Sequence, residues 1–351
     1  MPYCRKCGAK LDETARFCPT CGTPVVVATA APNQTVSKRR PYYILPVAIL
    51  VAVLVSAAVI GSLLFLPVYP VNFNQTNEVP EADMNNLFLD FQVDIAQVNI
   101  FFKNLPGNMA MLNVTADGGV GILDDPNRAL NVTFDHTATN NSVAVIARVS
   151  QTSRWTLLHS LNVKCDIYID PSANLTLQVR SSIGGIMMDA DTKVSLQRID
   201  IEASIGSVEV SLSKGAVAAG SISLRTTTGS VQFKMDKADV SGNVSVNLRS
   251  TTGAVNLDLA AAQLSGNATV NARTTTGSVN LHMAIDGDVG ARIESDADLG
   301  RITLDVQRFS GNQSPIQSNN YPAGSNFLVN LRTNTGGISI NAAYGSSTVL
   351  N

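Results

Sequence analysis

The sequence predicts an all-β protein, built as a solenoid with turns of about 24 residues. The first observation is a phrase of arginine, hydroxyl residues and glycine that recurs at an interval of 24 residues. Its copies are Arg225–Val231, Arg249–Val255 and Arg273–Val279, and a looser copy, Arg332–Ile338, closes the chain. A period of this length indicates stacked units that cannot bury their apolar faces alone.

The second observation is the alternation of apolar and polar residues at period two on both sides of each repeated glycine. This alternation indicates strands, and glycine suits the bend between them because it tolerates positive φ. The period predicts that Phe233, Leu257 and Leu281 share one interior column. It also places Lys234 opposite Asp258 and predicts that Thr, Ser and Asn form ladders on the outside.

At the amino end, two cysteine pairs predict a metal site in residues 1–24. The pairs are Cys4-x-x-Cys7 and Cys18-x-x-Cys21. Zn²⁺ favours four thiolates in a tetrahedron, and a two-residue gap lets one turn supply two of them. Because four sulfurs leave no open position, we expect one structural Zn²⁺ per chain. Disulfides are the alternative, but they are rare in the reducing cytoplasm, where the basic cluster Lys38-Arg39-Arg40 places this segment.

These cysteines resemble those of the short zinc-ribbon family found at the ends of many prokaryotic membrane proteins. The resemblance covers residues 3–24. It implies a small zinc-binding domain, and we expect this domain to dock to a cytoplasmic protein. Some zinc ribbons bind nucleic acid, but residues 1–41 carry only seven Lys or Arg against two acids, much of that charge next to the predicted membrane segment. Nucleic acid is therefore not expected as a partner.

A basic linker, residues 25–41, leads to an uncharged run of 23 residues, Ile44–Leu66. As a helix this run would be roughly 34 Å long, enough to cross a hydrocarbon core of about 30 Å. We expect a transmembrane helix within residues 42–69. Lys38-Arg39-Arg40 precedes it, so the positive-inside rule places the amino end in the cytoplasm. A cleaved signal peptide is the alternative, but the run is long and begins late.

Beyond the predicted membrane segment, the polar residues 70–90 are expected to form a stalk, and residues 91–351 the β-solenoid. Residues 87–345 resemble the putative-adhesin family, through the strand and proline turn Leu161–Pro171 and glycine-punctuated units such as Ile183–Ile186. The resemblance implies a single-stranded β-helix and brings no catalytic residues. Cys165 lies in an alternating strand pattern and is expected to be a buried, inert thiol.

Two sets of charged residues are candidates for function. Arg225, Arg249 and Arg273 recur on consecutive units, where guanidinium groups could hold an anionic polymer such as a sulfated or phosphorylated glycan. The sequence by itself favours the other interpretation, an outward column whose long stems cover neighbouring units and whose charges are solvated or paired to nearby acids. The acids that could serve a β-helix carbohydrate-active enzyme are Asp286, Asp288, Asp296 and Asp298.

The sequence as a whole predicts a non-enzymatic, single-pass protein of the cell membrane. Its solenoid would lie outside the cell for binding or adhesion to a glycan or another surface polymer, and its zinc ribbon would dock a cytoplasmic partner. A carbohydrate-active enzyme on a β-helix is one alternative. A transmembrane sensor that relays a signal to the cytoplasmic partner is another.

Overall fold

The computed structural model describes residues 3–25, 49–56, 58, 69–80, 85–120, 125–139, 141–152, 161–213, 216–260 and 263–345. The chain divides into two compact units, Met1–Leu64 and Phe65–Asn351. In the first unit, isolated β-bridges join Tyr3 to Lys10 and Phe17 to Pro24.

The predicted membrane segment lies mostly outside the described residues. Within it, residues 49–56 are helical, and their side chains are exposed. No helix among the described residues has the length and apolar character needed to span a membrane. The span within residues 42–69 therefore stays a prediction.

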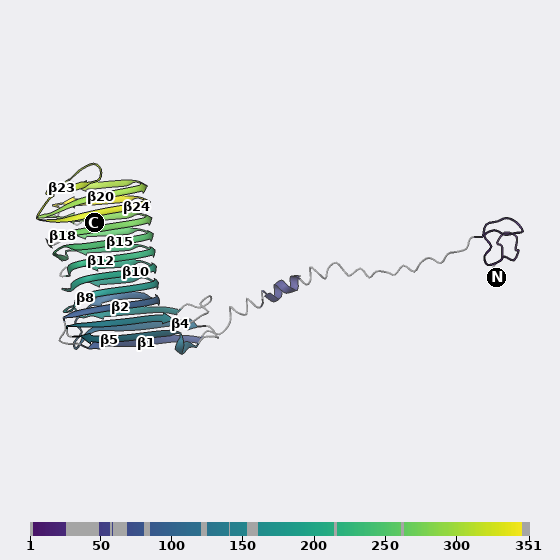
Figure 1. The fold of residues 1–351 in the computed structure, drawn as a ribbon, viewed down its shortest axis with the longest axis horizontal. Coiled ribbons are helices and arrows are strands. Elements are labelled where there is room, and N and C mark those ends of the chain that lie inside the picture. The colour runs from purple at the N-terminus through teal and green to yellow at the C-terminus, as the bar shows by residue number, and fades with distance from the viewer. Residues whose placement is uncertain are drawn as a thin grey trace. The chain divides into compact units, whose positions relative to one another are not determined.

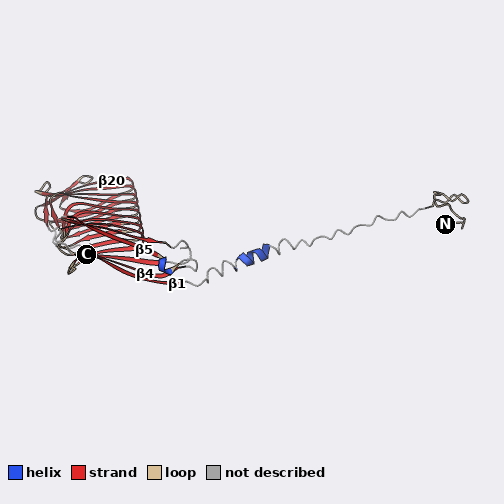
Figure 2. Ribbon diagram, turned by 60° about the horizontal axis from the view of Figure 1, so that its bottom comes forward, coloured by secondary structure: helices blue, strands red, loops and turns tan. Residues whose placement is uncertain are grey.

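The second unit consists almost entirely of strands, as predicted, and these form two sheets (Figures 1 and 2). The first sheet has 11 strands, in the spatial order β1 (Tyr69–Pro80), β4 (Asn108–Val120), β7 (Leu161–Ile169), β3 (Gln97–Phe102), β9 (Ile186–Ala190), β11 (Val208–Leu212), β13 (Val231–Asp236), β16 (Val255–Ala260), β19 (Val279–Ile285), β25 (Ile338–Tyr344) and β21 (Ile302–Gln307).

The second sheet has 14 strands, and through the central part of the chain its strands alternate in sequence with those of the first sheet. Twelve of its strands follow the order β22 (Phe309–Ser310), β23 (Ile316–Ser318), β20 (Val289–Leu299), β24 (Ser325–Thr335), β18 (Asn267–Thr276), β15 (Val244–Thr252), β12 (Val217–Thr228), β10 (Ser195–Ile205), β8 (Asn174–Ile183), β2 (Asn86–Ile95), β6 (Ser142–Gln151) and β5 (Leu130–Thr139). The short strands β14 (Asp239–Ser241) and β17 (Gln263–Ser265) pair beside β12, and a 3₁₀ turn, Pro126–Arg128, precedes β5.

A strand of the second sheet, a bend and the next strand of the first sheet make one rung, and the central rungs pair in parallel with the predicted register. Phe233 is paired with Leu257 and Leu257 with Leu281, and all three side chains are buried. Lys234 lies opposite Asp258, as the 24-residue period requires. The inward side chains of both sheets join one continuous apolar core.

The bend of each central rung is a glycine because successive backbones approach closely there. Gly253 has φ of +142°, and a Cβ at this position would overlap the carbonyl oxygen of Gly229. The same contact recurs from Gly277 to Gly253. A side chain would therefore meet both backbone strain and the neighbouring rung, which explains why glycine recurs in every copy of the repeated phrase.

The hydroxyl residue that follows each repeated arginine points inward, and this corrects the expectation that Thr and Ser form only outer ladders. Ser250 donates its hydroxyl hydrogen to the carbonyl oxygen of Gly229 at 2.9 Å, and Thr274 donates to that of Gly253 at 2.9 Å. Both side chains are fully buried. These bonds satisfy carbonyl groups that the bends leave inside the stack, where an unpaired acceptor is costly.

A uniform coil of 24-residue turns is not what the chain builds, because the last two rungs are stacked in reverse of their chain order. The closing rung, made of β24 and β25, pairs directly with β18 and β19. The paired residues Arg273 and Arg332 are 59 positions apart in the sequence. The intervening rung, β20 with β21, lies beyond it. Figure 1 shows β24 between β18 and β20.

The two rungs differ at the inward position beside the arginine column. The closing rung carries Thr333, which donates its hydroxyl hydrogen to the carbonyl oxygen of Gly277 at 3.0 Å. The intervening rung has Ala297 at that register position, so it has no hydroxyl to offer. The closing rung thus continues the series of inward hydroxyl groups at Ser250 and Thr274, which Ala297 would not continue.

At the other end of the stack, residues 70–90 are not a stalk. They include β1 and the start of β2, so the strand-rich unit begins near residue 69 rather than residue 91. β1 pairs antiparallel with β4 along its whole length and forms one edge of its sheet. Pro70 and Pro80 are tolerated there because an edge strand has backbone positions that need no donor.

Candidate functional sites

The four cysteines of the first unit converge as the sequence predicts. The Sγ atoms of Cys4 and Cys21 are 3.6 Å apart, as are those of Cys7 and Cys18, and all four sulfurs lie within 4.8 Å of one another. A tetrahedron with Zn–S bonds of about 2.3 Å requires sulfurs about 3.8 Å apart. The four thiols therefore fit a Zn²⁺ ion.

Two similar turns place these sulfurs. In the first, Gly8 N–H donates to the carbonyl oxygen of Cys4 at 2.9 Å, and in the second Gly22 N–H donates to that of Cys18 at 2.8 Å. Gly8 and Gly22 have φ of 70° and 69°, which non-glycine residues adopt at a cost. Each turn holds its two cysteines close together. Hydrogen bonds from the side chain and backbone of Thr23 lower the pKa of Cys21 to about 6, toward the thiolate that binds metal.

The predicted arginine column exists on the outer face of the second sheet and is longer than expected. Arg225 pairs with Arg249, Arg249 with Arg273, and Arg273 with Arg332 of the closing rung. All four side chains are exposed. We call Arg225, Arg249, Arg273 and Arg332 the arginine ladder. With strands about 4.8 Å apart, the ladder spans about 14 Å across four strands.

Within the described part of the chain, no acidic side chain forms an ion pair with Arg225, Arg249 or Arg273. Arg332 differs, because its guanidinium group lies 3.5 Å from a carboxylate oxygen of Asp296 and 3.9 Å from one of Asp298. The ladder thus ends in acids at one side. At the other side, Glu202 of β10 is paired with Arg225 in the register.

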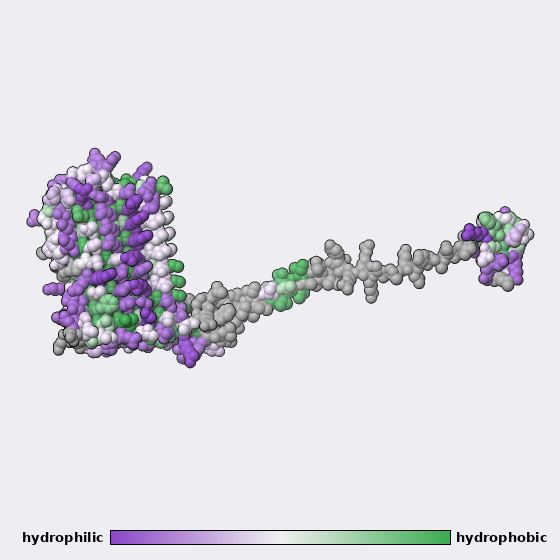
Figure 3. Space-filling model, viewed as in Figure 1, coloured by the Kyte–Doolittle hydropathy of each residue, from purple (hydrophilic) through white to green (hydrophobic). Residues whose placement is uncertain are grey.

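The column beside the ladder is made of amides that bond to one another. Asn271 donates to the side-chain oxygen of Asn247 at 3.0 Å, and Asn330 donates to that of Asn271 at 2.9 Å. On the face seen in Figure 3, hydrophilic side chains gather in stripes that run across the strands. An array of this kind presents the same groups at each rung, which suits a ligand that is itself repetitive.

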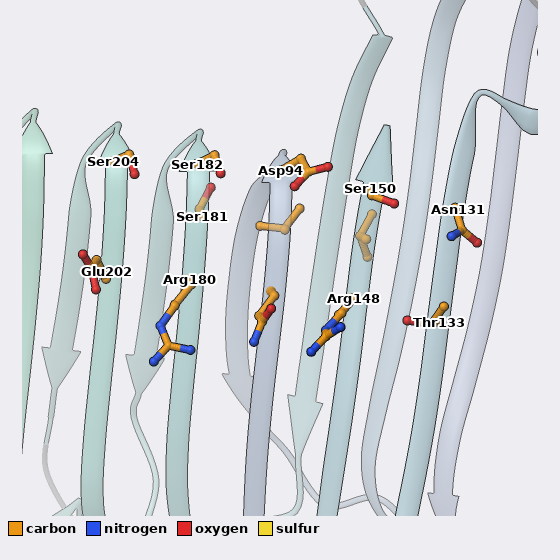
Figure 4. A pocket seen from close by; sticks show the side chains of 13 residues that line it. Asp94, Asn131, Thr133, Arg148, Ser150, Arg180, Ser181, Ser182, Glu202 and Ser204 are labelled. Carbon is orange, nitrogen blue, oxygen red and sulfur yellow. The ribbon is translucent and has the colours of Figure 1, made fainter. Parts of the chain in front are cut away.

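Beyond Glu202 the same register line enters a groove. It is lined by Arg180 of β8, Gln92 of β2 and Arg148 of β6, with Asp94 and several serines at one end (Figure 4). Arg148 is paired with Gln92, which is paired with Arg180, and Arg180 is paired with Glu202. Sequence reasoning missed these two arginines because they lie outside the regular repeat.

The acids considered for catalysis do not form a shared centre in the described residues. Asp296 and Asp298 face Arg332, and Asp286 accepts a backbone hydrogen bond from Val289 in a turn. The cysteine quartet is the one group of three or more His, Cys, Asp or Glu residues in the described ranges that could hold a metal ion. On the first sheet, His282 Nδ1 lies 3.4 Å from Asp258, as an isolated surface pair.

Cys165 is buried in β7, as the sequence predicts. Burial, together with the charge of Asp166, raises the pKa of this thiol to about 12. A neutral thiol without access to solvent has no nucleophilic role.

Comparison with protein families decides what the cysteine unit resembles. Residues 3–25 match the zinc-ribbon domain family. This match agrees with the spacing and convergence of the four sulfurs. No curated protein sequence matches the chain.

Several solved structures resemble the strand-rich unit. One is a putative cell adhesion protein from Clostridium sporogenes ATCC 15579, with 12% identity, a TM-score of 0.39, and coverage of 77% of this chain and 99% of that chain. Another is a putative adhesin from Bacteroides fragilis NCTC 9343, with 14% identity, a TM-score of 0.34, and coverage of 77% and 96%. At these identities and scores the likeness assigns neither a ligand nor an activity.

Proposed function

We propose that this chain is a non-enzymatic, membrane-anchored binding protein that holds a β-solenoid outside the cell and a zinc ribbon in the cytoplasm. The observation that carries the binding role is the set of identical polar side chains repeated across the outer face of the second sheet. Asn247, Asn271 and Asn330 bond into one ladder, beside the arginine ladder. Such even ladders favour a repetitive ligand over a single reacting group.

A carbohydrate-active enzyme on the same fold has less support. Most glycosidases use a pair of carboxyl groups on either side of the bond that they cleave. Asp296 and Asp298 instead share Arg332.

The proposed anchor is the uncharged run Ile44–Leu66, with Lys38-Arg39-Arg40 on the cytoplasmic side. The helical residues 49–56 expose a continuous apolar surface, with Leu50 and Leu54 about 60% accessible. A helix that is apolar on all sides is stable when lipid or protein surrounds it. This feature supports the span, and the strand-rich unit would then lie outside.

The zinc ribbon would dock a cytoplasmic protein. We propose one structural Zn²⁺ per chain, bound by Cys4, Cys7, Cys18 and Cys21. Tyr3 and Phe17, each just before the first cysteine of a pair, are 64% and 63% exposed. Two exposed aromatic side chains on so small a unit favour a protein contact. If this contact relays a signal across the membrane, the protein is a transmembrane sensor, which is the alternative form of the proposal.

Metal analysis of the reduced full-length protein tests the ribbon. We expect one zinc ion per chain, lost when Cys4→Ser and Cys18→Ser are combined and retained in Cys165→Ala. Zinc retained by the double variant would refute this assignment.

The membrane topology is tested by protease added to intact cells that express the chain with a tag at each end. We expect the tag after Asn351 to be removed and the tag at the amino end to be protected. The reverse pattern would refute the orientation. A soluble form that lacks the amino-terminal tag would instead establish a cleaved signal peptide.

A further inference from the structure

We propose that the arginine ladder binds a linear acidic polysaccharide that lies across the strands and places an anionic group beside each guanidinium group. This inference deepens the proposed binding role and rests on it, because the ladder meets a surface polysaccharide only when the strand-rich unit faces outward. The inference specifies the ligand class, the residues that hold it and the direction in which it lies.

The first step is the charge of the ladder. Arg225, Arg249 and Arg273 are directly paired in the parallel register, and like charges on neighbouring strands repel. Among the described residues no acid forms an ion pair with them, and Glu202 is adjacent in the register only to Arg225. A polyanion that crosses the strands would reduce this repulsion and accept charge-assisted hydrogen bonds from each guanidinium group.

The second step is the exchange of the last two rungs. If the rungs stacked in chain order, β20 would follow β18 and Asp296 would lie next to Arg273. The closing rung instead places Arg332 there and displaces Asp296 by one strand. The exchange thus extends the ladder to four arginines, whereas simple repetition along the chain would end it with a carboxylate after three.

The third step is the surroundings of the ladder, which favour a polysaccharide over a nucleic acid. On one side lie Ser223 and the bonded asparagines, and on the other lie Thr227, Thr251 and Thr275, which face outward with the arginines because strand side chains alternate. Amides and hydroxyl groups bond readily to sugar hydroxyl groups. The aromatic side chains on which single-stranded bases stack are absent from these positions.

The ladder also has defined ends. Glu202 precedes Arg225 in the register, and Asp296 and Asp298 lie at Arg332. These carboxylates repel an anionic chain, so they confine it to the four central strands. Beyond Glu202 the line continues through Arg180 and Arg148 in the groove of Figure 4. Removal of the Glu202 charge would therefore join the groove to the ladder.

The experiment measures binding of the detergent-purified full-length protein to immobilised polygalacturonate, with neutral dextran as the blank. The test variant combines Arg225→Gln, Arg249→Gln and Arg273→Gln. Its control combines Arg128→Gln, Lys193→Gln and Arg301→Gln, which removes the same charge from exposed positions elsewhere. We expect the test variant to bind at least about tenfold more weakly, since each charge-assisted hydrogen bond contributes appreciably, and the control to bind like the parent.

A second pair of variants tests the ladder through an increase in binding rather than a decrease. Glu202→Gln should tighten binding several-fold, whereas Glu209→Gln, the same change on an exposed position of the other sheet, should leave it unchanged. Equal losses in the two triple variants, or no gain with Glu202→Gln, would overturn the ladder as the site.

Single-stranded DNA and inorganic polyphosphate serve as competitors. We expect polygalacturonate to be displaced by other acidic polysaccharides at lower concentrations than by either of these. Tighter binding of DNA or polyphosphate through the same arginines would overturn the ligand class. The protease measurement of topology is independent of the binding measurement. If the strand-rich unit faces outward but does not bind polygalacturonate, the ladder proposal fails and the proposed topology stands. If the unit binds polygalacturonate but faces the cytoplasm, the proposed role at the cell surface fails.

Discussion

Thr333 donates its hydroxyl hydrogen to the carbonyl oxygen of Gly277 at 3.0 Å, although 56 residues separate the two in the chain. The bond continues the inward series that Ser250 and Thr274 make with the two preceding glycine bends. It joins the closing rung to β18 and β19, where chain order alone would place the rung made of β20 and β21. This local bond is therefore tied to the order of the whole stack.

Replacement of Thr333 by valine should destabilise the strand-rich unit. Valine keeps the shape but removes the donor, so a buried carbonyl loses its partner at a cost of about 1–3 kcal/mol. Thr335→Val, on an exposed position of the same strand, is the matched control and should change stability little. Thermal unfolding followed by circular dichroism measures both. Equal midpoints for the two variants would contradict the role of this hydroxyl.

Neighbouring residues Leu257 and Asp258 should differ sharply in their importance. Leu257 is 2% exposed in the interior column, and its replacement by alanine should cost about 2–5 kcal/mol. Asp258 makes a surface pair with His282 at 3.4 Å, and Asp258→Ala should cost at most about 1 kcal/mol. Chemical denaturation of the two variants checks this. A larger effect at Asp258 would contradict the register.

Gly253 should not tolerate a side chain. Its φ of +142° is strained for other residues, and a Cβ would overlap the carbonyl oxygen of Gly229, so Gly253→Ala should lower stability by more than about 2 kcal/mol. Gly324 has open space around it, which makes Gly324→Ala the matched control with a change within about 0.5 kcal/mol. Similar midpoints for the two alanine variants would show that the rungs do not approach closely at the bend.

The thiol of Cys165 should stay unreactive in the folded protein. Burial raises its pKa from 9.0 to about 12, so the folded state favours the neutral thiol. The contribution of this thiol to the free energy of unfolding is fully present below pH 9.0 and is lost as the pH rises toward 12. After removal of metal, alkylation at neutral pH should modify the other four cysteines first, as mass spectrometry of the peptides would show. Rapid labelling of Cys165 without denaturant would contradict its burial.

The sequence was sufficient to predict the convergence of the four cysteines and the register of the central rungs. Two cysteine pairs with a short gap leave few geometries, and an unbroken 24-residue period fixes which residues are neighbours. The alternation around Leu257 then decides which side chains face the core. Each of these inferences depends on local spacing alone.

Other features depended on competition between distant segments. Residues 70–90 were predicted to be a stalk because β1, an edge strand with polar residues at alternate positions and a proline near each end, has the composition of a linker. The exchange of the closing rung brings Thr333, rather than Ala297 of the intervening rung, next to Gly277. The looser copy of the repeated phrase contained that signal, since it keeps the inward hydroxyl that the intervening rung lacks.

Engineered cysteines test the order of the stack most directly. Residues paired across parallel strands lie about 4.8 Å apart, which a disulfide can bridge, whereas residues two strands apart cannot be joined. Arg273 and Arg332 are paired, and Asp296 lies one strand further. Peptide mapping after mild oxidation should find a disulfide in the variant with Arg273→Cys and Arg332→Cys and none in the variant with Arg273→Cys and Asp296→Cys. The opposite result would place the rungs in chain order and end the ladder at three arginines.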